Sequence, residues 1–456
     1  MLTESGCEKL IDEALSRGAK LGTKAKPVEL EVSVTASNIA TSRFANNEMT
    51  QNQAPLVKSL SVRVLTNGRQ ARLDTEDLSK QGIKQVVENA YACAGLLDKD
   101  KEMLPLLKAD KKVKLPRYNH FDSHTATTTP LERAEKILSV IDLAKAKKVS
   151  IAGFYSTGEH MEAIGNSRGL FQFYKESSCE CSLTALADSA TSWAKAANPR
   201  ASEINTARMA ERVIDKALAA RRPQEITPGR YLCILEPSAV LDLLGYLWWD
   251  FTATSHVDKL SCLLGKVGKK VFGSLTIEDN AAHPLQFGSP FDGEGQARSK
   301  VTLVENGVVK SLVTGRRSAQ ALNLPNTGHA LPEPSSYGEM PVNIVIHGGD
   351  TTLEEMIASV QGAQEAILIT RVWYVREVDP ALKLITGMTR DGTFLVKNGA
   401  IEKPLRNLRF NVSLLELLNN VVALGPSERT AGQETFTSVV PPMMLADFNF
   451  TEATKF

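Results

Sequence analysis

Histidines are the residues here whose type could support metal chemistry, because a catalytic zinc ion needs imidazole, thiolate or carboxylate ligands close together. The chain contains seven histidines. Only His120 and His124 are spaced about one helical turn apart, and Asp122 lies between them. Their segment, YNHFDSHT, has no apolar helical face. The pattern therefore favours a surface loop over a metal site.

A second group of charged residues, Glu159, His160 and Glu162, begins a predicted strand. Side chains alternate between the two faces of a strand, so His160 and Glu162 share one face and Glu159 occupies the other. Two ligands allow weak cation binding at most. We interpret this group as the polar face of a strand.

Asp292 and Glu294 bracket a glycine in the segment SPFDGEG. Together with His256 they could form a non-standard hydrolytic site. The same residues also suit a sharp turn with solvent-exposed carboxylates, because glycine and aspartate are favoured in turns. The sequence has no G-x-S-x-G nucleophile elbow, no P-loop and no G-x-G-x-x-G after a predicted strand. These three motifs therefore give no candidate nucleophile or nucleotide-binding loop.

The composition is that of a globular protein larger than one hydrophobic core, since 456 residues predict two to three domains. Lys and Arg number 53 and Asp and Glu 52, so the net charge gives no bulk attraction to nucleic acid. Apolar stretches are shorter than the ~18 residues that span a bilayer, and the N-terminus does not resemble a signal peptide. The six scattered cysteines predict reduced thiols. We expect a cytoplasmic protein that binds neither nucleic acid nor membranes.

Periodicity and turn residues predict alternating helices and strands in residues 1–222. We expect helices at 3–19, 77–97, 131–147 and 205–220, the last capped by Asn205. We expect strands at 28–37, 38–50, 59–65 and 69–75, and four further short runs between 149 and 187. An exposed polar connection is expected at 98–129. The first domain is therefore predicted to be α+β, with antiparallel strands and helices on one face.

Proline and glycine near 221–229 mark a predicted boundary between domains at 1–222 and 223–456. In the second domain, YLCIL (231–235) is a predicted strand. A buried helix is expected to begin at Glu236-Pro237 and to continue through LLGYLWWDFTATSH (243–256). Hairpins are expected at Asn306-Gly307 and Asn398-Gly399, and short helices near 352–362 and 412–422. These features favour a mostly antiparallel β barrel or sandwich with a few helices.

Six segments, in this order, resemble the TldD/PmbA family, also called TldD/TldE. These bacterial proteins are linked to peptide maturation and degradation and were once described as modulators of DNA gyrase. The segments are RFANNEMTQN (43–52), GNSRGL (165–170), LTIEDNAAHPLQFGSPFDGEG (275–295), VENGVVKSLVTGRRSAQALNLPNTGH (304–329), VVALG (421–425), and Gly432-Gln433 with Pro441-Pro442.

This resemblance implies two kinds of subunit that pair as a heterodimer. TldD-type subunits carry H-E-x-x-x-H on a helix near the start of the C-terminal domain and a third zinc ligand, a cysteine, near the C-terminus. TldE/PmbA-type subunits lack these ligands. Here the corresponding helix reads LLGYLWWDFTATSH, and Cys262 is the last cysteine. The chain is therefore similar to the TldE/PmbA branch, which implies no catalytic residue, metal ligand or cofactor of its own and a zinc ion in a TldD-like partner.

The resemblance further implies a subunit that helps to enclose an unfolded peptide, which could be held as an added strand on a sheet edge. We expect His256, Asp292, Glu294, Asn46 and Asn166 to face that peptide. The expected partner is a TldD-like homologue, and a homodimer is also compatible. Two alternatives remain open: a metallopeptidase with its own site, or a regulatory binding protein of the gyrase-modulator type.

Overall fold

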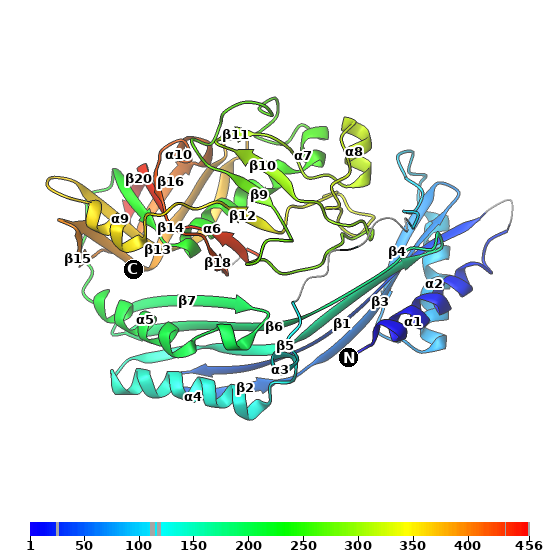
Figure 1. Cartoon of the computed structure of the whole chain (residues 1–456), viewed down its shortest axis with the longest axis horizontal. Helices are drawn as coiled ribbons and strands as arrows, with labels where there is room; N and C mark the ends of the chain where they lie inside the picture. Colours follow the sequence, from blue (N-terminus) through cyan, green and yellow to red (C-terminus); the bar gives the residue numbers. More distant parts are fainter. Residues whose placement is uncertain (24–26, 110–114, 116–119, 434, 455–456) are drawn as a thin grey trace.

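The computed structural model describes the whole chain except residues 24–26, 110–114, 116–119, 434 and 455–456. We call residues 1–222 the first half and residues 223–456 the second half. The first half forms one long curved sheet, and the second half lies over one face of that sheet while helices cover the other (Figure 1). Helices and antiparallel sheets together confirm the predicted α+β class.

The long sheet has seven strands in the order β4-β3-β1-β5-β6-β7, with β2 paired to β1. The strands are β1 (Val28–Ala45), β2 (Glu48–Gln53), β3 (Leu56–Thr66), β4 (Arg69–Thr75), β5 (Ser150–Asn166), β6 (Phe171–Ala187) and β7 (Ala190–Asn198). The division of the predicted strands was wrong in two places: 28–37 and 38–50 form the continuous β1 and then β2, and the four short runs form β5 and β6. Polar positions that looked like breaks are paired along the neighbouring strand, which carries these strands through them.

Helices cover the face of the long sheet opposite the second half. They are α1 (Glu4–Gly18), α2 (Lys80–Leu96), α4 (Pro130–Ala146) and α5 (Thr206–Ala219), with the short α3 (Ser123–Thr127) and η1 (Ala201–Glu203). Asn205 caps α5 as predicted, because its side chain accepts the backbone N–H of Arg208. Alternation along β1 places Val32 and Val34 in the core with α1 and α2.

The second half contains two further sheets, ordered β11-β10-β9-β12-β19-β18 and β13-β8-β20-β16-β14-β15, with β17 paired to β20. The strands are β8 (Arg230–Leu235), β9 (Ile277–Asp279), β10 (Val301–Glu305), β11 (Val308–Val309), β12 (Ile344–Ile346), β13 (Glu365–Asp379), β14 (Leu384–Lys397), β15 (Ala400–Pro404), β16 (Leu408–Ser413), β17 (Val421–Leu424), β18 (Glu428–Thr430), β19 (Ser438–Val440) and β20 (Met443–Ala453). Both predicted Asn-Gly hairpins are confirmed: Asn306, Gly307, Asn398 and Gly399 all have positive φ.

The helices of the second half are short. They are α6 (Pro237–Leu244), η2 (Gly245–Phe251), α7 (Ala253–Val257), α8 (Arg316–Leu322), α9 (Leu353–Ser359) and α10 (Leu414–Leu417). Across the described part of the chain, every helix is too short or too polar to cross a bilayer.

An ion cluster around the buried Glu236 joins α5 of the first half to the start of α6. Glu236, which is 4% exposed, lies directly before α6. Its carboxylate pairs with Arg212 at 2.6 Å and with Lys216 at 2.5 Å, both from α5. Because breaking a buried ion pair leaves an uncompensated charge, this cluster fixes the position of α6 relative to the first half.

Candidate functional site

The segment predicted as one helix after β8 is divided into α6, η2 and α7. Gly245, a weak helix former, ends α6, and Thr252 caps the separate α7. The aromatic content is buried as expected, with Trp248 2% exposed and Phe251 fully buried. Bulky side chains therefore fill the core side of this segment, where metal ligands would need room.

A groove of 190 Å³ runs between α6, the start of η2 and β13. It is lined by Asp242, Gly245 and Tyr246, by residues 372–375 of β13, and by Gln433 and Thr435 from near the C-terminus. The Oδ1 atom of Asp242 accepts the Gln433 N–H at 3.1 Å and the Thr435 hydroxyl at 3.3 Å. The fold thus brings α6 and the C-terminal segment together.

The donor atoms of this groove do not fit a zinc ion. A catalytic zinc uses three protein ligands, mostly imidazole and thiolate. The groove instead offers the Asp242 carboxylate, and the Tyr246 hydroxyl donates to the Val375 carbonyl at 2.6 Å. Within the described ranges, His, Cys, Asp and Glu form no group of three or more that could hold a metal.

His256 and Cys262, the first histidine and the first cysteine after α6 in the sequence, form contacts within the fold. The Nε2 atom of His256 lies 3.2 Å from the Asp250 carbonyl oxygen, and burial lowers the pKa of this imidazole. Cys262 is 4% exposed, and burial raises the pKa of its thiol to about 12. The imidazole and the thiol are therefore both engaged within this segment.

His120 and His124 are not brought together. The Nδ1 atom of His120 lies 2.8 Å from the Tyr174 hydroxyl, and burial lowers the pKa of His120 to about 4. The side chain of His124 is 68% exposed and lies 3.9 Å from Glu132. Residues 118 and 119 of the quoted segment lie outside the described residues.

The Asp-Gly-Glu-Gly turn at 292–295 is a tight turn, but its carboxylates are buried, so the expectation of solvent exposure was wrong. Asp292 is 3% exposed and accepts backbone N–H groups of Glu294, Gln296 and Ala330 at 3.0, 2.9 and 2.9 Å. These three bonds satisfy the buried carboxylate. Asp292 therefore stabilises the turn, and the turn places the Glu294 side chain next to the first half.

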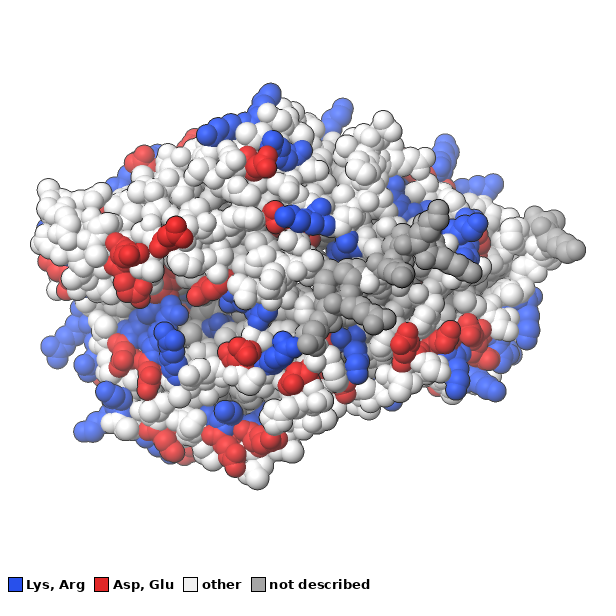
Figure 2. Space-filling model, in the orientation of Figure 1, with Lys and Arg blue, Asp and Glu red and all other residues white. Residues whose placement is uncertain are grey.

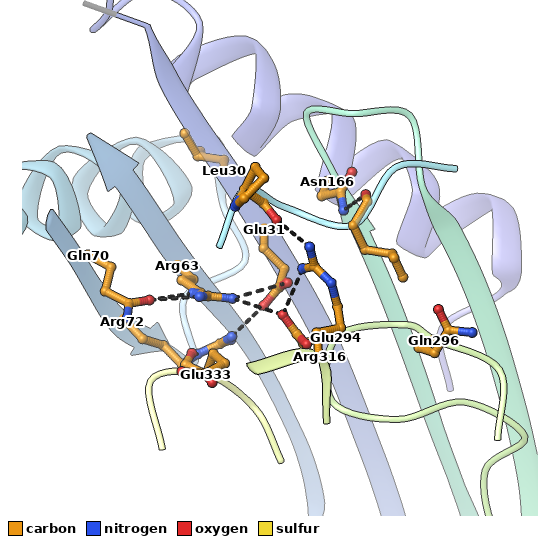
Figure 3. A network of polar contacts seen from close by, with 12 residues as sticks. Leu30, Glu31, Arg63, Gln70, Arg72, Asn166, Glu294, Gln296, Arg316 and Glu333 are labelled. Atoms are coloured by element: carbon orange, nitrogen blue, oxygen red, sulfur yellow. Dashed lines mark hydrogen bonds and ion pairs between the residues drawn. The ribbon is translucent and has the colours of Figure 1, made fainter. Parts of the chain in front are cut away.

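Glu294 enters a network of charged side chains where the two halves meet (Figure 3). Its Oε1 atom lies 3.1 Å from Arg316 Nη1 and 3.8 Å from Arg63 Nη1. Arg63 of β3 and Arg72 of β4 also pair with Glu31 of β1, at 3.6 and 2.6 Å. Burial raises the pKa of Glu294 to about 7, with Asp292 and Glu31 adding to the rise and Arg316 and Arg63 opposing it.

Asn166 and Asn46 have separate positions. Asn166 is 1% exposed, and its Nδ2 atom donates to the carbonyl of Leu107 at 2.8 Å beside the charged network. Asn46 lies exposed in the β1–β2 turn with a φ of 50°. Fourteen strand residues, 32–45, lie between it and Glu31, a separation of about 50 Å along β1. The five candidates therefore do not surround one site: Asp292, Glu294 and Asn166 belong to the junction between the halves, and Asn46 lies at the other end of the sheet.

Glu31, Arg63 and Arg316 are the junction residues that the sequence reasoning missed. Alternation along 28–37 does place Glu31 on the face opposite Val32, where Arg63 is its cross-strand neighbour. That pattern gives the face of the strand but not what covers it. The covering side chains come from residues more than 200 positions away.

The surface carries charges of both signs. Over the face shown in Figure 2, Lys and Arg are interspersed with Asp and Glu. This mixture agrees with the formal net charge of +1 and gives this face no bulk attraction for a polyanion.

Comparison with known proteins gives one consistent result. Residues 30–94, 124–221 and 228–452 match, in turn, domain 1, the central domain and the C-terminal domain of the PmbA/TldA metallopeptidases. The chain is 24% identical to the metalloprotease PmbA of Escherichia coli O157:H7 over 96% of each chain. It is 25% identical to the PmbA homologue of Haemophilus influenzae over 91% of each.

The same fold occurs in a solved structure. The crystal structure of TldE from Thermococcus kodakarensis superposes with a TM-score of 0.85 at 21% identity, covering 97% of this chain and 100% of TldE. The arrangement of sheets described above is therefore that of TldE.

Proposed function

Because this chain belongs to the PmbA/TldD family of metallopeptidases, we propose that it acts as a TldE/PmbA-like subunit that has no zinc of its own. A TldD-like homologue would supply the catalytic zinc, and this chain would help to enclose the unfolded peptide to be cleaved. The observation that carries the proposal is the donor set of the groove at α6, which does not fit zinc.

The groove supports a role in holding an extended peptide. Strand β8 pairs with β13 over Ala366–Ile369, and beyond that point the edge of β13 borders α6 and the groove. A bulge between Trp373 and Arg376 interrupts the pairing with β14, and the Tyr374 side chain between them is 51% exposed. An incoming peptide could pair with the β13 backbone with little dependence on sequence, while Tyr246 and Trp373 supply apolar surface.

The alternative of a metallopeptidase with its own site at His256, Asp292 and Glu294 lacks a supporting observation. Both oxygens of Asp292 bind backbone N–H groups, and His256 contacts the Asp250 carbonyl. We further propose a cytoplasmic location, supported by the six free cysteines.

Reconstitution tests the proposed function. The chain should cleave an unfolded fluorogenic peptide only after mixing with a TldD-like homologue, and a chelator should abolish that cleavage. Gly245→Leu places a side chain in the groove, where even a Cβ would approach Thr435 Cγ2 at 2.5 Å. This variant should still co-purify with the homologue but lower the cleavage rate at least about tenfold.

Gly95→Leu is the matched control, because a Cβ at Gly95 meets nothing within 4 Å, and its rate should equal that of the unchanged chain. Zinc-dependent cleavage by this chain alone would refute the proposal. Full activity of the Gly245→Leu pair would remove the role of the groove.

A further inference from the structure

Residues 103–108, which form neither helix nor strand, lie in the junction between the two halves. We call them the strap. Leu106 at its centre is only 2% exposed, although the polar stretch around it predicts an exposed connection. The strap is therefore packed into the fold and contacts both halves.

The strap is held through its backbone carbonyls. Arg316 Nη2, from the second half, donates to the carbonyl of Pro105 at 2.7 Å. Asn166 Nδ2, from the first half, donates to the carbonyl of Leu107 at 2.8 Å. Carbonyls two residues apart point the same way in an extended chain, and backbone contacts do not read side chains. These two donors would hold any extended peptide in the same manner.

The residues directly before the strap are held by partly exposed ion pairs. Asp100 and Glu102 pair with Arg317 at 2.7 and 3.2 Å, and the Arg317 side chain is 39% exposed. Asp100 is 23% and Glu102 77% exposed, and pairs in contact with solvent contribute little to stability. The strap can therefore leave the junction without breaking a strongly held ion pair.

A pocket lies next to the strap at the junction between the two halves. It has a volume of 270 Å³ and is lined by Glu102, Glu294, Arg316, Arg317, Glu333 and Glu339, among others. The charged network of Figure 3 forms one wall of this space. A longer ligand than the strap would therefore find room and hydrogen-bonding groups here.

We propose that the junction is a second peptide-binding site, separate from the groove at β13, and that the strap occupies it in cis until a free extended peptide replaces it. The site takes a peptide backbone through Arg316 and Asn166 and an apolar side chain at the position of Leu106. Peptide binding at the junction does not depend on the proposed function; only its role in the cell rests on that function. An intramolecular occupant acts at millimolar effective concentration, so free peptide binds weakly while the strap is in place.

The test measures binding of a fluorescein-labelled peptide, EMLPLLKA, which has the sequence of residues 102–109. Leu106→Asp puts a carboxylate where burial disfavours it and should release the strap. Fluorescence anisotropy should then show a peptide Kd at least about tenfold lower than for the unchanged chain. Adding Arg316→Ala to Leu106→Asp should reverse most of that gain. Leu97→Asp, at an exposed leucine, should bind like the unchanged chain.

A folded Leu106→Asp variant that binds no tighter, or a gain that survives Arg316→Ala, overturns the proposal. If Leu106→Asp does not fold, hydrogen exchange on the unchanged chain decides. Saturating peptide should speed exchange of the strap amides, and unchanged exchange with bound peptide overturns the proposal. Neither result depends on peptidase activity, so failure of the proposed function would be recognised separately.

Discussion

Replacing Glu294 with glutamine should remove a pH-dependent loss in the free energy of unfolding. The Glu294 side chain is 7% exposed at the junction, and burial, more than its charged neighbours, raises its pKa from 4.5 to about 7. The folded chain therefore binds this proton more tightly than the unfolded chain does. Below about pH 4.5, the pKa of Glu294 in the unfolded chain, the carboxyl is protonated in both the folded and the unfolded chain. Its ionisation then has no effect on stability.

The cost grows as the pH rises from about 4.5, where the unfolded chain ionises, and is complete above about 7, where the folded chain also ionises. A rise of about 2.5 in pKa corresponds to about 3 kcal/mol of stability lost across that window. The neutral amide introduced by Glu294→Gln does not ionise and carries no such cost. The stability of the unchanged chain should therefore fall by about 3 kcal/mol more than that of Glu294→Gln over this range.

Urea unfolding of both proteins at several pH values, followed by tryptophan fluorescence, measures this difference. Other titrating groups cancel because they are common to both proteins. Glu8→Gln, at an exposed position on α1, is the control and should run parallel to the unchanged chain. A difference between the Glu294→Gln protein and the unchanged chain that stays constant with pH would refute the reasoning.

Three further changes have defined outcomes. Lys383 is buried between Asp250 at 2.5 Å and Glu377 at 2.6 Å, so Lys383→Met should cost about 3–5 kcal/mol in urea unfolding because it leaves a buried carboxylate unpaired; a loss below about 1 kcal/mol would show that the pair is dispensable. Asn205→Ala removes the cap of α5 and should cost about 1 kcal/mol, seen as a lower melting temperature, whereas Asn205→Ser should not. A thiol reagent should modify at most Cys93 in the native chain, since the other five cysteines are buried, and all six after unfolding; rapid native modification of several thiols would contradict the packing.

Features set by short-range chemistry were predicted well. The Asn306-Gly307 and Asn398-Gly399 hairpins follow from the left-handed conformation that Asn and Gly tolerate. The Asn205 cap follows from an amide oxygen placed before an apolar helical repeat. Each of these depends on a few neighbouring residues, so the sequence around them was sufficient.

Features set by distant contacts were not predicted. Glu31 is buried on a strand face where Glu294 and Glu333 of the second half contact its partners Arg63 and Arg72 (Figure 3), which alternation cannot reveal. The strap has a polar surrounding sequence, yet Leu106 is buried, and its neighbours Pro105 and Leu107 accept hydrogen bonds from the distant Arg316 and Asn166. At Gly245, where α6 ends, a Cβ would lie 2.5 Å from Thr435 Cγ2, a contact with a distant part of the chain that local helix propensity does not include.

The most direct test of the central claim is the zinc content of the purified chain after incubation with excess zinc and removal of unbound metal. The donors around Asp242 and Tyr246 are too few and too hard to hold this ion, so mass spectrometry should find well below one zinc per chain, and about one per pair with a TldD-like homologue. About one tightly held zinc per chain in the absence of a homologue, lost on mutation of Asp242, would contradict the account.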